Sequence, residues 1–494
     1  MLTMNAASFL EEDLKNKNMR KIIFKSENNN HYLLSESNGM ILYLPNKSHR
    51  IQPNKVNSSY YIRKEEFWEK HGVFKSYVPN LDVNYDDQRI KSNLANLRML
   101  LIEMTDGCNL ACKYCGYRDL YNNYDKREDK KQNFINVKAL IDYLEVLWRS
   151  PLNVSYNNII TIGFYGGEPL LSFEMIKQII EYLDSLKLKE IKFSFNMTTN
   201  AMLLDLHMDY LVDKNFNILI SLDGNENNNS YRVTKNGKPS FSKIVSNTLL
   251  LKEKYPQYFK DHVQFNSVLH NNNSVEDIYY FIKQKFDKIP TIAELNSNGV
   301  IESKKEEFYR MFRNRIQDAD RIEGCEDLKE DLYLSDPNVA NFDYFIDAFL
   351  SNTFKSYADL FIDEKKQKYI PTGTCQPFNR KIFLTVNGKI LPCERIGQNL
   401  PIGKVENGKV NIDYVYIRDF YAGMYQKLID QCKDCALWKN CTLCVYLIEK
   451  KENNKKCNRF ISKNNSCSYF SYYISFIENK PTLYKRVVNE ISKY

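Results

Sequence analysis

From residue 97 onward, the chain alternates between short apolar runs and longer stretches with a helical period. The run LRMLLIEMT begins at residue 97, and comparable runs begin near residues 159, 191, 217, 262 and 291. The stretches between them repeat apolar residues every three to four positions, as in NVKALIDYLEVLW. Short apolar runs are typical of buried strands, and longer periodic stretches are typical of amphipathic helices. The pattern therefore predicts six strands with five helices between them.

Alternation of this kind favours a parallel sheet. Six strand–helix units curl part of the way toward the eight of a closed barrel, so we expect an α/β fold built on a partial (βα)6 TIM barrel. Such folds collect their chemistry where strands end and loops begin. A three-cysteine segment follows the first strand, GGEP follows the second, TTN ends the third and SLDG ends the fourth. We expect these four stretches to converge in space.

The two ends of the chain follow other patterns. Short strands are predicted at Lys21–Lys25, His31–Ser35 and Met40–Leu44, and helices at Lys64–Lys70 and Tyr472–Tyr494. The predicted domains are a β-rich module at 1–95, the barrel at 96–320, a helical linker at 321–370, a cysteine-rich domain at 371–470 and a C-terminal helix at 471–494.

Composition narrows the functional classes. The chain has 494 residues, a formal net charge of +8 and 43% hydrophobic residues, which suits roughly three domains with a large core. The pI of about 8.6 lies below the value that is typical of nucleic-acid-binding domains. We recognise no signal peptide and no run of ~18 apolar residues that could span a membrane. We therefore expect a cytoplasmic protein with neither a nucleic-acid nor a membrane partner.

Three of the 12 cysteines stand within eight positions, as Cys108-x3-Cys112-x2-Cys115. In a reducing compartment such thiols stay free to bind metal. A zinc site needs four ligands, and no fourth ligand lies nearby in the sequence. Three thiolates suit an iron–sulfur cluster that leaves one iron open. The alternatives are half of a zinc site or three unrelated cysteines.

The Cx3CxxC spacing after the first barrel strand, with GGEP after the second, resembles the signature of the radical S-adenosylmethionine (radical SAM) enzymes. In that family the cysteines hold a [4Fe–4S] cluster, and the amine and carboxylate of S-adenosylmethionine chelate its open iron. An electron from the cluster then releases a 5′-deoxyadenosyl radical that abstracts hydrogen. The resemblance therefore implies both the cluster and S-adenosylmethionine as cofactors.

The resemblance also implies contacts to S-adenosylmethionine. They are Gly166, Gly167, Glu168 and Pro169 toward the amine, Ser221 and Arg232 toward the carboxylate, Asn200 toward the ribose and Tyr114 near the adenine. For the last four residues, the alternative is a helix cap, an ion pair or a place in the core.

Eight further cysteines occupy the last quarter of the chain. Eight thiolates can fill two sites of four, either iron–sulfur clusters or structural zinc. The pattern resembles the SPASM domain, which carries auxiliary [4Fe–4S] clusters. The resemblance implies one auxiliary cluster on Cys375, Cys393 and Cys444, and a second on Cys432, Cys435, Cys441 and Cys457.

The cysteine pattern departs from the usual SPASM form in two places. The last gap of the CxxCx5CxxC segment is one residue shorter, and no extra cysteine lies between Cys375 and Cys393. The first auxiliary cluster therefore either keeps an open iron or recruits Cys467, which is otherwise a free thiol. Cys325 stands alone, and we do not expect it to be a ligand.

The resemblance extends to the peptide maturases that accompany double-glycine-leader precursor peptides in Bacteroidales-type bacteria. It covers most of the chain and includes MTTNAMLL, YRVTKNGKPSF and FNSVLHNNNSVEDI. It implies that the protein crosslinks or otherwise modifies a ribosomally made precursor peptide, with flavodoxin or ferredoxin as electron donor. The N-terminal module would capture the leader by strand addition. The alternative is that this module only closes the barrel.

The sequence also contains one candidate catalytic residue, and it leaves two alternative functions open. Glu394, next to Cys393, is a candidate proton acceptor, and a surface pair with Arg395 is the alternative. An anaerobic sulfatase-maturase-like enzyme that converts Cys or Ser to formylglycine would share the chemistry, but it would not need the N-terminal extension. A zinc-stabilised nucleic-acid-binding protein is the alternative of another class, and it would be colourless rather than brown.

Overall fold

The computed structural model describes residues 21–35, 41–44, 63, 67, 70–71, 79–154, 158–189, 191–322, 326–334, 339–350, 369, 376–438, 441, 443–447, 457 and 459–491. The chain divides into two compact units. The barrel unit comprises Asn84–Asp336 and Cys375–Ala422, and the second unit comprises Met1–Val83, Pro337–Thr374 and Gly423–Tyr494.

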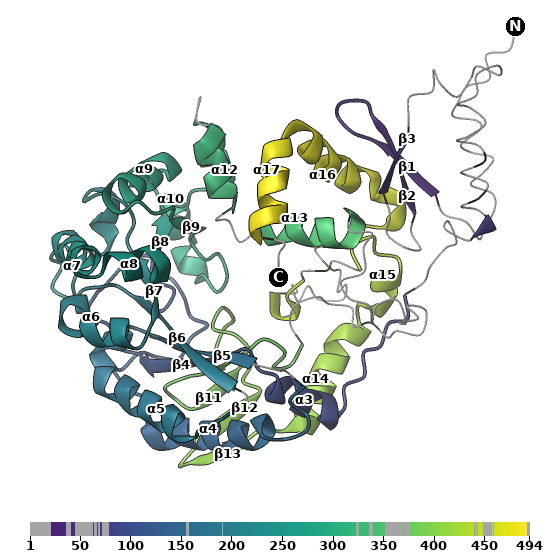
Figure 1. The fold of residues 1–494 in the computed structure, drawn as a ribbon. Coiled ribbons are helices and arrows are strands. Elements are labelled where there is room, and N and C mark those ends of the chain that lie inside the picture. The colour runs from purple at the N-terminus through teal and green to yellow at the C-terminus, as the bar shows by residue number, and fades with distance from the viewer. Residues whose placement is uncertain are drawn as a thin grey trace, which may run out of the picture. The chain divides into compact units, whose positions relative to one another are not determined.

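Six consecutive parallel strands form the centre of the barrel unit (Figure 1). They are β4 (Met99–Thr105), β5 (Asn158–Gly166), β6 (Ile191–Thr199), β7 (Asn217–Ser221), β8 (Val263–Leu269) and β9 (Thr291–Glu294). Each strand pairs with the next in parallel register, so that Ser221, for example, lies opposite Asn266. The predicted partial barrel is confirmed, with strand starts close to those expected from the apolar runs.

Helices cover the outer face of these strands (Figure 1). They are α4 (Phe134–Trp148), α5 (Phe173–Ser185), α6 (Leu204–Asp213), α7 (Phe241–Lys254), α8 (Pro256–His262) and α9 (Val275–Phe286). Each helix buries the apolar stripe that its period predicts: in α4, Val137, Leu140, Ile141 and Leu144 are all buried. The outward side chains of the strands meet these stripes and form the core.

The inner face of the strands is different from the outer face. In β6, β7 and β8, alternate residues point inward and are only half-buried, whereas the residues between them are buried. Alternate side chains of a strand point to opposite faces, so this period-two pattern separates the two sides of the sheet. One side is sealed by helices, and the other remains accessible to solvent along these three strands.

Four short strands extend the barrel sheet beyond β4, and the sequence pattern did not predict them. Strand β10 (Lys381–Leu384) pairs with β4 in parallel, and β11 (Lys389–Leu391), β12 (Gly403–Glu406) and β13 (Lys409–Asn411) follow in antiparallel order. They satisfy the backbone groups that the edge of β4 would otherwise expose. The extension places the segment after residue 375 with the barrel, so the division into units cuts across the predicted domain at 371–470.

The second unit contains a three-stranded antiparallel sheet at the predicted positions. Its strands are β1 (Lys21–Lys25), β2 (His31–Ser35) and β3 (Ile41–Leu44). Helix α16 (Cys467–Asn479) packs against β1, where the ring centroids of Phe24 and Phe470 are 5.8 Å apart. Most of the helix predicted at Lys64–Lys70 lies outside the described residues.

The C-terminal segment, predicted as one helix over Tyr472–Tyr494, is broken in the structure. Helix α16 ends at Asn479, and α17 (Pro481–Arg486) begins after Lys480, followed by a π-helical turn at Val487–Ile491. Proline has no N–H to continue the helix and disfavours helical geometry in the residue before it, which explains the break.

The remaining helices connect these elements. They are α3 (Asp87–Ala95), α10 (Lys305–Met311), α11 (Arg315–Asp320), α12 (Glu326–Leu334), α13 (Val339–Phe345), α14 (Tyr414–Gln426) and α15 (Ile429–Lys433). Of the helices seen in the described residues, none combines the length and hydropathy that a membrane span requires.

Candidate active site

The three-cysteine loop begins directly after β4 and is held by the segment that follows β7. The backbone N–H of Ala111 donates to the carbonyl of Val233 at 2.6 Å, and that of Lys113 donates to the carbonyl of Tyr231 at 3.1 Å. The loop therefore runs against the residues on either side of Arg232. These backbone bonds join the cysteine loop, one of the four predicted stretches, to a segment that follows SLDG in the chain.

The GGEP loop at the end of β5 lies against the same cysteine loop. The N–H of Gly167 donates to the carbonyl of Thr105 at 2.8 Å, and that of Glu168 donates to the carbonyl of Gly107 at 2.9 Å. A Cβ at position 167 would lie 1.9 Å from the carbonyl oxygen of Gly107. Position 166 has φ +128°, which also favours glycine. Glycine at both positions is therefore required for the two loops to approach this closely.

The thiols of the loop lie in a partly buried environment. Burial raises the pKa of Cys108 to about 11 and that of Cys112 to about 12, and the neighbouring cysteines add to both shifts. The Sγ of Cys108 is approached by the N–H of Leu110 at 3.4 Å and by Nδ2 of Asn200 at 3.7 Å. Such N–H donors stabilise a thiolate, so the site suits a metal that displaces the thiol protons.

In the described part of the chain, no three Cys, His, Asp or Glu side chains are gathered as ligands of a single metal ion. In a cubane iron–sulfur cluster, each cysteine binds a different iron atom, so the sulfur atoms need not converge on one point. Cys115 lies close enough to Cys108 and Cys112 to raise the pKa of both thiols. The loop therefore fits a [4Fe–4S] cluster held by Cys108, Cys112 and Cys115.

Comparison with known proteins agrees with this geometry. Residues 102–284 match the family model described as the radical SAM superfamily. These residues form a radical SAM domain, which contains the three-cysteine loop and GGEP. Over 197 residues it is 29% identical to a cysteine-type anaerobic sulfatase-maturating enzyme of Clostridium novyi, covering 39% of this chain and 49% of that relative. Over 408 residues it is 23% identical to the radical SAM cyclopropyl synthase TigE of Paramaledivibacter caminithermalis, covering 79% of this chain and 77% of TigE.

A solved structure shares the fold. The structure of anSMEcpe with bound AdoMet matches with a TM-score of 0.51 at 20% identity, covering 80% of this chain and 100% of that chain. The chain spans about half the length of the Clostridium novyi relative that it matches. The radical SAM domain implies S-adenosylmethionine and a [4Fe–4S] cluster as cofactors, and the zinc-stabilised nucleic-acid-binding alternative is left without support.

Within this radical SAM site, Glu168 and Asn200 tie the ends of β5 and β6 together. The buried carboxylate of Glu168 accepts hydrogen bonds from the N–H of Asn200 at 2.8 Å and from Oγ1 of Thr199 at 2.7 Å. Burial raises the pKa of Glu168 to about 7, although these bonds oppose the shift. The side chain of Asn200 donates to Oδ1 of Asn109 at 2.7 Å, in the cysteine loop. Both side chains are therefore engaged with the protein, and their predicted contacts to the cofactor stay predictions.

Arg232, predicted to meet the cofactor carboxylate, is paired with a residue that sequence analysis missed. Its Nε and Nη2 donate to the two carboxylate oxygens of Asp223, both at 2.9 Å, and both side chains are buried. Burial opposes the ionisation of Asp223, but Arg232 and His270 outweigh it and lower its pKa to about 2. Ser221 ends β7, two residues before Asp223, and is half-buried. The position of Asp223 in SLDG, at a strand end, is the signal that could have identified it.

Tyr114 also turns toward Asp223. Its hydroxyl donates to Oδ2 of Asp223, and its ring stacks on that of His270 with centroids 5.6 Å apart. Nδ1 of His270 accepts the N–H of Asn272 at 3.1 Å, and Nε2 lies 3.8 Å from Oδ2 of Asp223. Tyr114 thus anchors the cysteine loop to the ends of β7 and β8, and its predicted place near the adenine stays a prediction.

Glu394 is paired with Lys381 rather than mainly with Arg395. Nζ of Lys381 lies 2.9 and 3.1 Å from the two oxygens of Glu394, whereas Nε of Arg395 lies 3.9 Å away. Burial opposes ionisation, but Lys381 outweighs it and lowers the pKa of Glu394. Oε2 of Glu394 is 3.5 Å from Sγ of Cys393. The carboxylate therefore stands beside the predicted cluster ligand in its ionised form.

Four predicted auxiliary ligands come together in the second unit. Burial raises the pKa of Cys432 to about 12, and Cys441, Cys435 and Cys457 contribute to the shift as neighbours. The N–H of Cys457 donates to Oε1 of Gln431 at 3.0 Å, next to Cys432. This is the set implied for the second auxiliary cluster, and its role as ligands stays a prediction.

The other predicted auxiliary ligands are not gathered in this way. Cys393 belongs to the barrel unit and Cys444 to the second unit, while Cys375 and Cys325 lie outside the described residues. Sγ of Cys467 is 3.9 Å from the carbonyl oxygen of Ile23, at the start of α16. The ligands of the first auxiliary cluster therefore stay a prediction.

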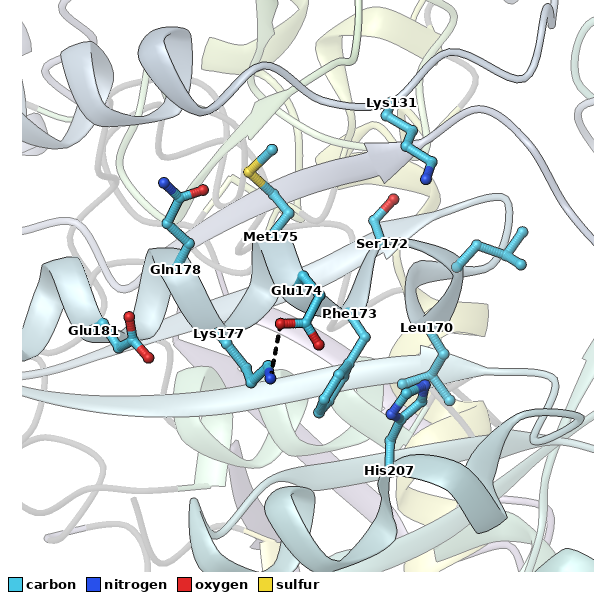
Figure 2. Close-up of a pocket in the computed structure, with 11 residues that line it drawn as sticks. Lys131, Leu170, Ser172, Phe173, Glu174, Met175, Lys177, Gln178, Glu181 and His207 are labelled. Carbon is cyan, nitrogen blue, oxygen red and sulfur yellow. Dashed lines mark ion pairs between the residues drawn. The ribbon is translucent and has the colours of Figure 1, made fainter.

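A cavity of about 670 Å³ lies along α5, separate from the cysteine loop (Figure 2). Glu174 and Lys177 form an ion pair of 2.8 Å at its wall, and Phe173 stacks on His207 with ring centroids 3.8 Å apart. Of the described residues, no predicted cluster or cofactor ligand lines it. The cavity is not part of the radical SAM site.

Proposed function

We propose that the protein is a radical SAM peptide maturase that modifies a ribosomally made precursor peptide bearing a leader sequence. The observation that carries the proposal is the contact between the three-cysteine loop and the GGEP loop at the ends of neighbouring strands, beside an accessible inner face. The sequence similarity to TigE, named as a radical SAM cyclopropyl synthase, and to sulfatase-maturating enzymes supports this class of chemistry.

The inner face presents polar side chains that suit an uncharged segment of peptide. Asn196, Thr198, Ser221 and Asn266 point inward from β6, β7 and β8 and are half-buried. Among the described residues, their side chains have no hydrogen-bond partner, so they are available to a ligand. Carboxamide and hydroxyl groups both donate and accept, which suits the alternating N–H and C=O groups of a peptide backbone.

When bound, the cluster and S-adenosylmethionine supply the hydrogen-abstracting radical chemistry, and the protein supplies position and shielding from water. Cys108, Cys112 and Cys115 would hold the cluster, and the GGEP backbone lies against their loop. Lys381 keeps Glu394 ionised, as a proton acceptor requires, while lowering its basicity. The auxiliary cysteines would hold the clusters that accept the surplus electron.

The N-terminal sheet is the proposed site of leader recognition. Three short antiparallel strands can capture an extended peptide by adding it as a further strand. Flavodoxin or ferredoxin is the proposed electron donor. Removal of residues 1–83 should weaken binding of the precursor while leaving cleavage of S-adenosylmethionine in place.

The first test is anaerobic reconstitution with iron and sulfide, followed by S-adenosylmethionine and dithionite. We expect brown protein, iron content above that of one cluster and formation of 5′-deoxyadenosine. The Cys108/Cys112/Cys115→Ala triple variant should form none. A Cys432/Cys435→Ala variant is the matched control, because it should lose iron but keep 5′-deoxyadenosine. A colourless wild-type protein that forms no 5′-deoxyadenosine would refute the proposal.

Sulfatase maturation is the second candidate, favoured by the similarity to a cysteine-type anaerobic sulfatase-maturating enzyme. The reconstituted protein should be incubated with a cysteine-containing sulfatase peptide, and any aldehyde should be trapped with hydroxylamine. We expect 5′-deoxyadenosine without a trapped aldehyde. A trapped formylglycine product would favour the sulfatase maturase over the precursor-peptide maturase.

A further inference from the structure

The carboxylate of Asp223 joins three segments around the cysteine loop. It accepts two hydrogen bonds from Arg232, one from the hydroxyl of Tyr114 and one from the N–H of Val268, which is 2.9 Å from Oδ1. The side chain of Asp223 is fully buried, and that of Arg232 is 7% exposed. Few degrees of freedom remain to a guanidinium that is held by its Nε–Nη2 edge in this way.

One nitrogen of Arg232 remains available. Of the three guanidinium nitrogens, Nε and Nη2 are used by Asp223, and Nη1 has no partner among the described residues. Nη1 is not fully buried, so solvent or a ligand can reach it. Asp223 occupies the Nε–Nη2 edge, so Arg232 can meet a ligand with the two N–H groups of Nη1 and the second N–H of Nη2.

The backbone places this donor beside the cluster loop. The carbonyls of Tyr231 and Val233, on either side of Arg232, accept N–H groups from Lys113 and Ala111, which flank Cys112. Cys112 and Arg232 each affect the pKa of the other. Arg232 therefore lies next to the loop that would hold the cluster and its cofactor.

We infer that Asp223 is a positioning residue, which fixes the guanidinium of Arg232 so that Nη1 serves the carboxylate of S-adenosylmethionine. The inference rests on the proposed function. Because Asp223 occupies the Nε–Nη2 edge of Arg232, the arginine meets the cofactor carboxylate from its Nη1 side. Preorganisation of this kind improves binding by reducing the entropy lost when the ligand arrives. Asp223 carries its negative charge at neutral pH, because Arg232 lowers its pKa to about 2 against the effect of burial.

A purely structural role for Asp223 makes a different prediction. If it only neutralised Arg232 or anchored Tyr114, its loss would weaken every ligand of the loop alike, including ligands without a carboxylate. Decarboxylated S-adenosylmethionine, which keeps the amine and the sulfonium, therefore separates the two roles.

The test measures dissociation constants of reconstituted, full-length protein for S-adenosylmethionine and for its decarboxylated analogue. For Asp223→Asn we expect binding of S-adenosylmethionine to weaken about tenfold or more, with little change for the analogue. Arg232→Lys, which keeps the buried charge pair but not the planar fork, should show the same selective loss. Asp205→Asn is the matched control, because Asp205 on α6 pairs with Lys243 on α7.

The spectroscopic readout is the EPR signal of the reduced cluster, which should change less on addition of S-adenosylmethionine to Asp223→Asn than to the wild type. Unchanged affinity in both variants, or an equal loss for both ligands, overturns the inference. If the wild type itself binds no S-adenosylmethionine, the proposed function fails, and the inference fails with it. Arg232→Lys decides the question if Asp223→Asn does not accumulate as folded protein.

Discussion

The barrel unit contains two buried arginine–carboxylate pairs whose carboxyl pKa values are shifted in opposite directions. Both carboxylate oxygens of Asp223 accept N–H groups of Arg232, and the pKa of Asp223 is lowered to about 2. Glu103 accepts a single hydrogen bond from Nη1 of Arg127, at 2.5 Å, and one from the N–H of Val386, at 2.9 Å. Burial raises the pKa of Glu103 even though Arg127 opposes the shift.

This comparison shows that burial and a neighbouring opposite charge do not by themselves determine the direction in which a carboxyl pKa is shifted. Both carboxylates are almost completely buried, at 0% and 1% side-chain exposure. The difference lies in the number and geometry of the donors, because a bidentate contact offsets more of the cost of desolvation than one bond does. Arg127 instead stacks over Tyr117, 3.8 Å from the ring centroid, and Nε and Nη2 have no partner in the described residues.

The largest expected effect is that of removing the better-paired carboxylate. Asp223→Ala should lower the free energy of unfolding by about 3–5 kcal/mol, because it leaves a buried guanidinium without its partner. Urea denaturation of the metal-free protein measures it. Asp205→Ala, at a partly exposed pair with Lys243, should cost only about 0–1 kcal/mol. Equal losses in the two variants would contradict our view of the Asp223 pair.

Glu103→Gln should have a smaller effect, of about 1–2 kcal/mol on the free energy of unfolding. Glutamine keeps an acceptor for the N–H of Val386, and Arg127 is 17% exposed, so it can be hydrated in part. The same urea titration measures it. A loss as large as that of Asp223→Ala would remove the distinction between the two pairs.

The two carboxylates should affect the pH dependence of stability with opposite signs. The pKa of Asp223 in the folded protein is below its ordinary value of 3.8. Its stabilising effect is therefore present above pH 3.8 and is lost as the pH falls toward about 2. The pKa of Glu103 in the folded protein is above its ordinary value of 4.5, so ionisation of Glu103 weakens the fold as the pH rises above 4.5. Unfolding curves of the wild type, Asp223→Asn and Glu103→Gln across this range should separate the two effects.

The smallest expected effect on stability is that of an inward polar residue without a protein partner. Asn196→Leu should change the free energy of unfolding by no more than about 0.5 kcal/mol, because among the described residues its side chain has no hydrogen-bond partner to lose. Thermal denaturation measures it. A large loss would show that Asn196 belongs to the structural network of the barrel rather than to a face available to a ligand.

The six strands of the barrel and the position of the chemistry at their ends were predictable, because both depend on short-range patterns. Alternation between apolar runs and helical stretches located β4 to β9, and the Cx3CxxC and GGEP segments follow β4 and β5 within a few residues. The spacing of the three cysteines restricts what they can bind, and the two glycines allow their loop to approach the cysteine loop. These features depend on neighbours in the chain, so the sequence alone was sufficient to predict them.

The partners of the site residues were decided by tertiary structure. Arg232 pairs with Asp223, and Glu394 pairs with Lys381 more closely than with the adjacent Arg395. Likewise β10 joins the edge of β4 across more than 270 residues of chain. Composition and periodicity do not specify which of many compatible groups meet in space. That choice is made when the sheet closes, because each buried donor and charge must then find a partner among the groups that the fold brings near it.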